Sequence, residues 1–176
     1  RKLLKYLEKF CMKYNYELNI FGRQKYDYKT IGEYKNLIKG VNCKFINNDL
    51  PYYSIYKLYD LFDLFIFERS TAAYETIAAG KKTLVFNFYN EDKKWYQSHN
   101  MTDNFPHTDL NPTEGPFWSH ECEYSQFESK TLNIINMKQE NWDKISKPFI
   151  SKIMDYDYQN KKFKKIFNQL VNNKIE

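Results

Sequence analysis

The chain has 176 residues, which is enough for one well-cored domain, and its formal net charge of +5 arises from 27 basic and 22 acidic residues spread along the sequence. This balance suits an anionic ligand or a membrane surface, but it does not indicate a nucleic-acid partner. The 3 cysteines have no C-x-x-C spacing, which argues against a disulfide framework or a zinc knuckle and favours a reducing, cytoplasmic location.

Residues 1–15 have apolar side chains at helical spacing, interrupted by charged ones, so they predict an amphipathic entry helix rather than a signal peptide. No apolar run in the sequence is long enough to cross a membrane. Because the chain opens within this helix and without an initiator Met, we expect it to be the C-terminal part of a longer protein, with the N-terminal domain absent from the sequence.

Strand-like and helical patterns then alternate. Strands are expected at 18–21, 43–46, 64–67 and 83–88, and helices at 30–40, 54–62 and 71–79. The run at 64–67 is apolar throughout, which is typical of a strand buried on both faces. The alternation predicts an α/β fold in which the four strands form one Rossmann-like parallel sheet with helices on both faces, within a single domain of residues 1–176.

The pattern changes after residue 89. Residues 90–120 contain three prolines and all three histidines but few periodic apolar positions, which predicts a long loop that acts as a mobile lid. Residues 124–176 predict a helical tail, with a kink or break at Pro148. Its last part, 160–176, is a basic amphipathic helix that serves either as a solvated face or as a peripheral contact with the inner face of a membrane.

The stretch FERSTAAYETIAAGKKTLVFNF, residues 67–88, joins a strand end, a helix and the next strand. In an open parallel sheet, ligands bind beyond the carboxyl ends of the strands. Ser70 and Thr71 lie at the helix start, where free N–H groups favour a phosphate, and Glu75 lies on the same helix face as Thr71, within reach of a ribose diol. The same residues also fit an ordinary N-cap with an acidic first turn.

The segment STAAYETIAAGKKTLVF, residues 70–86, resembles the nucleotide-sugar motif in the C-terminal domain of glycosyltransferases with two Rossmann-like domains, the GT-B fold. GPFWSH at 115–120 and INMKQENW at 135–142 are similar to sequences in the bacterial surface-carbohydrate biosynthesis group of that fold. The resemblance spans roughly residues 18–142 and implies one half of a GT-B fold. It also implies transfer of a sugar from a nucleotide-sugar donor to a carbohydrate or lipid-linked acceptor, without a further cofactor.

The resemblance also implies roles for individual residues. Glu75 would bind the donor ribose, and Ser70 and Thr71 would hold its phosphates. Gly22 and Arg23 would lie near the same phosphates, where the planar arginine fork pairs with two oxygens. The catalytic residues are unknown, because the base in such enzymes comes from the N-terminal domain. We therefore expect this fragment to bind the donor without catalysing transfer.

The sequence departs from the family pattern just before the helix. Many relatives have a second acidic residue there, whereas this chain has Glu68 and Arg69, which are expected to pair with each other. The histidines lack the close, helix-borne spacing of a zinc motif, and GT-B enzymes need no bound metal for catalysis, so no metal site is expected. Two alternatives stay open: a sugar-nucleotide 2-epimerase that uses Glu75, and a non-catalytic module that binds a nucleotide or a partner.

Overall fold

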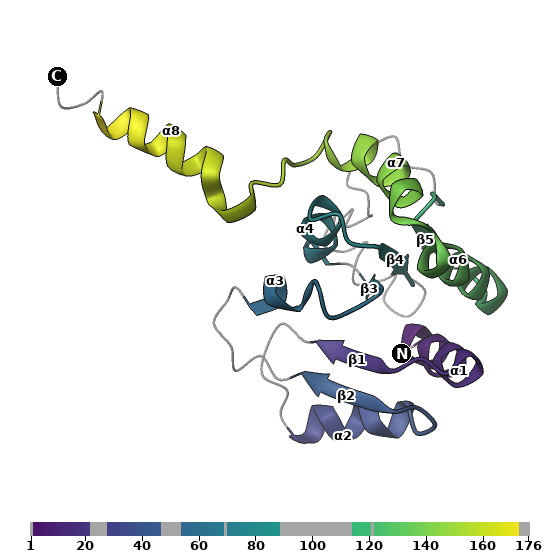
Figure 1. Cartoon of the computed structure of the whole chain (residues 1–176). Helices are drawn as coiled ribbons and strands as arrows, with labels where there is room; N and C mark the ends of the chain where they lie inside the picture. Colours follow the sequence, from purple (N-terminus) through teal and green to yellow (C-terminus); the bar gives the residue numbers. More distant parts are fainter. Residues whose placement is uncertain are drawn as a thin grey trace, which may run out of the picture.

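The computed structural model describes residues 2–21, 28–46, 54–68, 70–88, 114–120 and 122–172. Helices and strands alternate through the first half of the chain, and helices follow the last strand (Figure 1). The elements are α1 (Lys2–Tyr14), β1 (Leu18–Phe21), α2 (Tyr28–Leu37), β2 (Cys43–Ile46), α3 (Ser54–Leu58), β3 (Phe65–Phe67), α4 (Ala72–Ala78), β4 (Thr83–Asn87), β5 (Trp118–His120), α6 (Tyr124–Asn136), α7 (Gln139–Ile150), η1 (Tyr158–Asn160) and α8 (Lys161–Asn172).

Every pair of named strands is parallel, which confirms the expected Rossmann-like α/β class. β1 pairs with β2, with Leu18 opposite Cys43, and the other sheet has the order β3-β4-β5. The four predicted strands are therefore present at their expected places in the sequence.

The expectation of one continuous sheet is wrong for the described residues, because β1 and β3 are not paired. A cavity of about 450 Å³ lies between them, lined mainly by apolar side chains from both strands and from α1. β3 consequently forms an edge of its sheet, and its three residues are half-buried rather than covered on both faces. An apolar run in a sequence predicts that its side chains are buried. It does not predict whether a neighbouring strand lies close enough to form backbone hydrogen bonds with it.

β5 was not expected, because it lies within the segment 90–120 that the sequence predicts as a loop. It extends the sheet beyond β4, with Val85 opposite Trp118 and Asn87 opposite His120. A strand of three residues is too short to produce a recognisable alternation. Residues 90–113 lie outside the described residues, so the predicted lid stays a prediction.

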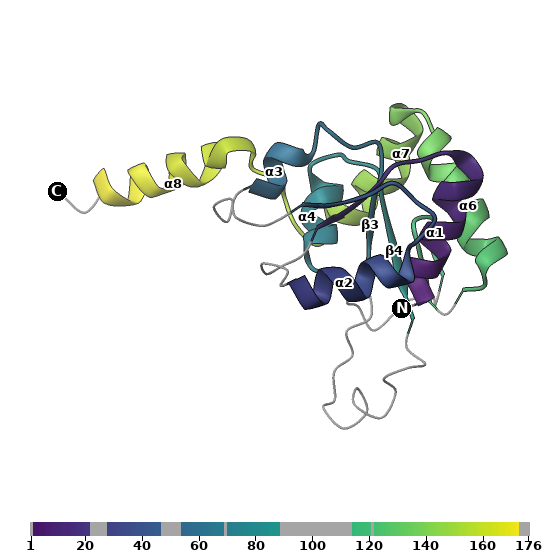
Figure 2. The ribbon, with the colours of Figure 1, turned by 90° about the horizontal axis from the view of Figure 1, so that it is seen from below.

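β4 is the centre of the core, and all five of its residues are buried. α4 packs on one face of β3 and β4, while α1 and α6 lie on the opposite side (Figures 1 and 2). On the α1 and α6 side, Phe86 packs against Phe127 with ring centroids 4.8 Å apart, and Tyr6 packs edge-on against Phe88 at 5.7 Å. The predicted arrangement of helices on both faces is confirmed around this strand.

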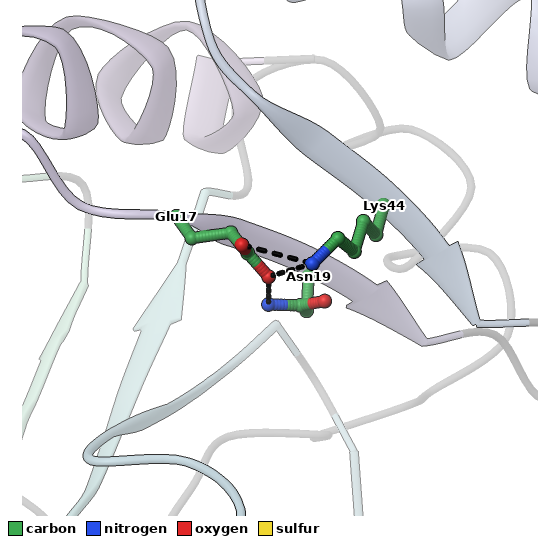
Figure 3. A network of polar contacts seen from close by, with 3 residues as sticks. All are labelled: Glu17, Asn19 and Lys44. Atoms are coloured by element: carbon green, nitrogen blue, oxygen red, sulfur yellow. Dashed lines mark hydrogen bonds and ion pairs between the residues drawn. The ribbon is translucent and has the colours of Figure 1, made fainter.

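A polar network joins the beginning of β1 to β2. The Glu17 carboxylate accepts hydrogen bonds from the Asn19 amide at 3.0 Å and from the Lys44 ammonium at 2.9 and 3.0 Å (Figure 3). Asn19 and Lys44 are cross-strand partners, so the network reinforces the register of the pair. Hydrogen bonds from Asn19 and Lys44 lower the pKa of Glu17.

The tail is helical, as expected. α6 begins with a capping box, in which the side chains of Glu123 and Gln126 bond each other's backbone N–H groups. Pro148 lies inside α7, which continues to Ile150, so the helix does not break at this proline, and the kink that was predicted as the alternative stays a prediction. Because Pro148 lies so near the helix end, only the last turn is affected by its missing N–H. α8 then extends away from the α/β body (Figures 1 and 2).

Candidate functional site

The predicted site lies at the carboxyl end of β3, where the chain turns into α4. Ser70 is half-buried, and its Oγ accepts a hydrogen bond from the Ala72 N–H at 3.3 Å. Thr71 is exposed at the N-cap position, and its side chain makes no capping hydrogen bond. The Ser70 hydroxyl therefore stabilises the start of the helix, which is the ordinary capping role that the sequence also allowed. The Thr71 side chain is exposed to solvent.

α4 is a short helix of seven residues held against the sheet by small and apolar side chains. Ala73 and Ile77 are buried, and the Thr76 hydroxyl donates to the Ala72 carbonyl oxygen at 2.7 Å. The helix ends at Ala78, and Gly80 follows the C-cap residue with a φ of 79°, the left-handed conformation that favours glycine. Close packing of this helix fixes where its outward-facing residues stand.

Glu75 is the outward-facing acidic residue of α4. It is half-buried, and its Oε2 accepts a hydrogen bond from the Tyr56 hydroxyl of α3 at 2.7 Å. This hydrogen bond is the main cause that raises the pKa of Tyr56, so Tyr56 remains a donor throughout the neutral range. A carboxylate has two oxygens with about four acceptor sites, so Glu75 keeps the capacity to accept further hydrogen bonds.

Tyr59 packs behind the Tyr56–Glu75 pair, on its buried side. Its ring is buried and packs edge-on against the ring of Tyr56, with centroids 5.5 Å apart. The Tyr59 hydroxyl oxygen lies 3.4 Å from the Thr76 hydroxyl on α4, and burial raises the pKa of Tyr59 to about 12. Tyr56 of α3 and Tyr59, just after its end, therefore both hold this segment to α4. Sequence reasoning missed both, although their spacing of three residues on a predicted helix was visible.

Asn87 is a second residue that sequence reasoning missed. It ends β4 at the carboxyl edge of the sheet and is fully buried, yet neither its amide nitrogen nor its amide oxygen has a hydrogen-bond partner among the described residues. Side chains alternate along a strand, so Asn87 faces away from the Phe86 side, toward the face that α4 covers. The sequence feature that could have identified Asn87 is its position as a polar residue at the end of an otherwise apolar strand.

The structure brings Ser70, Thr71 and Glu75 together on one turn and the helix that follows it. Gly22 and Arg23 lie outside the described residues, so their predicted phosphate contacts stay predictions, as does the expected Glu68–Arg69 pair, because Arg69 is also outside. The cavity between β1 and β3 is separate from this site, since none of the three residues lines it.

The described residues were also considered as metal ligands and as membrane-spanning helices. Within the described ranges, no group of three or more His, Cys, Asp or Glu residues is placed to hold a metal ion. His99 and His107 lie outside those ranges. Among the described helices, none combines the length and the apolar character that crossing a bilayer would require.

Comparison with known proteins gave one match, to a protein family. The family model described as "putative O-antigen biosynthesis protein" matches residues 1–171, nearly the whole chain. No curated protein and no solved structure matched the chain.

Proposed function

This chain belongs to the family described as putative O-antigen biosynthesis proteins, and from that premise we propose that it is the donor-binding domain of a GT-B-type glycosyltransferase. The family places the chain in surface-carbohydrate biosynthesis. The proposal adds a nucleotide-sugar donor, a carbohydrate or lipid-linked acceptor and transfer of the sugar between them, with no further cofactor and no metal.

The observation that carries the proposal is the Glu75 carboxylate. It lies on the helix that follows β3, near the carboxyl edge where ligands of open parallel sheets bind. Tyr56 holds one of its oxygens at 2.7 Å, which fixes the orientation of the carboxylate before any ligand arrives. A fixed carboxylate with open acceptor sites suits a vicinal diol such as that of a ribose, because both hydroxyls can donate to it.

The residues around Glu75 suit the rest of a nucleotide. The exposed Thr71 hydroxyl, one helical turn before Glu75, can donate to a phosphate oxygen. Gly22 and Arg23 are proposed to complete the phosphate contacts from the segment that follows β1. Tyr56 acts as a positioning residue, since it reaches the ligand through Glu75.

Calorimetric titration of the chain with UDP, GDP, CDP and CMP tests the proposal. Charge-assisted hydrogen bonds are worth about 1.5 to 3 kcal/mol, so Glu75→Ala should weaken binding of the preferred nucleotide on the order of tenfold to a hundredfold. Thr71→Ala should weaken binding of the nucleotide more than binding of its nucleoside. The melting temperature of Glu75→Ala should fall by only a few degrees, because the substitution removes a helix-dipole contribution of about 0.3 to 1 kcal/mol and one solvent-exposed hydrogen bond from Tyr56.

Glu140 provides a matched control, because it is an exposed glutamate in the first turn of α7. Glu140→Ala should bind the nucleotide as the wild type does. Wild-type affinity in Glu75→Ala would refute the assignment of the ribose contact. Analysis of the products formed from a nucleotide sugar distinguishes transfer to an acceptor from 2-epimerisation, in which the configuration at C2 of the sugar is inverted and no acceptor is glycosylated.

A further inference from the structure

α8 has an exposed apolar face. Four apolar residues lie three, four, seven and eight positions after Phe163, which places all five on one side of the helix. This set is called here the α8 stripe and consists of Phe163, Ile166, Phe167, Leu170 and Val171. Each of these side chains is between 42% and 64% exposed, and no residue of α8 is buried. Both ribbon views show α8 extending away from the α/β body, which leaves the stripe uncovered by the described part of the chain (Figures 1 and 2).

The start of α8 is a defined structural feature. The two carboxylate oxygens of Asp157 accept hydrogen bonds from the backbone N–H groups of Lys162 and Phe163, each at 2.9 Å. Gln159 and Asn160 have positive φ angles of 59° and 56°, and they turn the chain just before the helix. The carboxylate cap and this turn fix where the helix begins and therefore which residues form the stripe.

The charges on α8 are all of one sign. The helix contains four lysines, at positions 161, 162, 164 and 165, and no acidic residue. Lys162 pairs with Asp155, whereas Lys164 and Lys165 have no ion-pair partner among the described residues. At 3.6 residues per turn, Lys162 and Lys164 lie on the two flanks of the α8 stripe. The apolar face is therefore bordered by cations on both sides, which is complementary to an anionic surface.

We propose that the α8 stripe is a docking surface for an anionic lipid bilayer. The helix lies in the plane of the interface, with the two phenylalanines at the boundary of the acyl chains and the flanking lysines extended to the headgroup phosphates. A second copy of α8 is a poorer occupant, because pairing two stripes would bring lysines against lysines with no acidic residue in either helix. This proposal is independent of the nucleotide site, since no residue of α8 belongs to it.

Flotation of the whole chain with lipid vesicles tests the proposal. The chain should float with vesicles of phosphatidylcholine containing about one-third phosphatidylglycerol, and much less with vesicles of phosphatidylcholine alone. Binding should weaken as salt is added, because the lysines act through screened charge. Equal flotation with both compositions, or none with the anionic vesicles, would overturn the proposal.

Two double variants separate the apolar from the electrostatic contribution. Phe163→Ser with Phe167→Ser should weaken vesicle binding at least about tenfold, because two apolar anchors are removed. Lys162→Gln with Lys164→Gln, which removes both flanking lysines, should weaken it by up to roughly twenty-fivefold at low salt, because each lysine near the surface contributes about a fivefold factor. Gln169→Ser, on the polar side of the same helix, is the matched control and should bind as the wild type does.

All three variants should melt at the wild-type temperature, because α8 buries no residue. Sedimentation velocity without lipid tests the alternative that a second copy of the chain covers the α8 stripe. The wild type should remain monomeric as its concentration is raised. A dimer that the two serine substitutions abolish would show that a second copy covers the stripe, and would replace the membrane as its partner.

Discussion

At Asn87 the structure predicts whether a substitution raises or lowers the free energy of unfolding. Its side chain is fully buried, and neither polar atom of the amide has a hydrogen-bond partner within the part of the chain that the structure describes. Valine at this position removes both unpartnered atoms and introduces a side chain that strands favour, whereas asparagine is depleted in strands. We therefore expect Asn87→Val to stabilise the fold, although substitutions at buried positions usually destabilise it.

The magnitude follows from the two unpartnered atoms. A buried polar group without a partner costs about 1 to 3 kcal/mol, and part of this gain is lost if the valine methyl groups fit the site imperfectly. We expect a net gain in the free energy of unfolding of about 1 to 2 kcal/mol. For a chain of this length, that corresponds to an increase in melting temperature of about 2 to 8 °C.

Thr83 provides a control on the same face of the same strand. It is also fully buried, but its hydroxyl donates to the Lys81 carbonyl oxygen at 2.9 Å. Thr83→Val keeps the shape and removes a satisfied hydrogen bond, so it should lower the free energy of unfolding by about 1 kcal/mol. Two substitutions to valine on one strand should therefore act in opposite directions.

Urea denaturation followed by circular dichroism gives the free energies of unfolding of both variants. A loss of stability in Asn87→Val, equal to or greater than that in Thr83→Val, would refute the reasoning, because it would mean that the Asn87 amide is hydrogen-bonded in solution. Nucleotide titration of the same variant then shows whether the buried amide contributes to the ligand site. A more stable protein with weakened binding would be the pattern of a functional polar residue.

Three further predictions rest on single hydrogen bonds or on burial. Tyr56→Phe should weaken nucleotide binding by about threefold in calorimetric titration, less than Glu75→Ala, because it only releases the carboxylate that Tyr56 holds. Backbone hydrogen bonds lower the pKa of Asp157, so its cap on α8 is fully present above the unfolded pKa of about 3.9 and is lost as the pH falls through the lower folded value. NMR shifts of the two capped amide protons should follow that loss, and in Asp157→Asn they should not titrate. Burial raises the pKa of Cys11 to about 11 and also raises the pKa of Cys43, but Cys43 is only half-buried and the Lys35 charge opposes the rise there, so iodoacetamide at pH 8 should alkylate Cys43 before Cys11, as peptide mass spectrometry would reveal.

The sequence allowed the fold class to be predicted because the apolar runs and helical periods alternate along the chain. Strands with four or five apolar or alternating residues, such as β1 and β4, were found at their places. β5 was missed because three residues carry too little pattern. The single sheet was wrong because strand pairing depends on backbone distance, which a run of apolar side chains does not encode.

The candidate site was predicted in part for a similar reason. Ser70, Thr71 and Glu75 lie close together in the sequence, and a helix start brings such residues together in any fold. Tyr56 reaches Glu75 from 19 positions away, and only the packing of α3 against α4 reveals that contact. Asn87 was visible in the sequence as a polar residue at the end of an apolar strand, but only the structure shows that its amide lacks a partner among the described residues.

The gap between β1 and β3 bears on how the domain unfolds. Strands that exchange no backbone hydrogen bonds are not obliged to open together, so the unit of α2, β1 and β2 can open at a lower free energy than β3, β4 and β5. α1 connects the two units, since Phe10 stacks on Tyr16 beside β1 at 5.7 Å and packs edge-on against Phe127 of α6 at 6.0 Å. Cooperativity between the two sheets therefore passes through α1, and Phe10 is a side chain of that helix that contacts both units. Amide protons of β1 and β2 should exchange with solvent through a partial opening that leaves β4 protected, and Phe10→Ala should widen that difference.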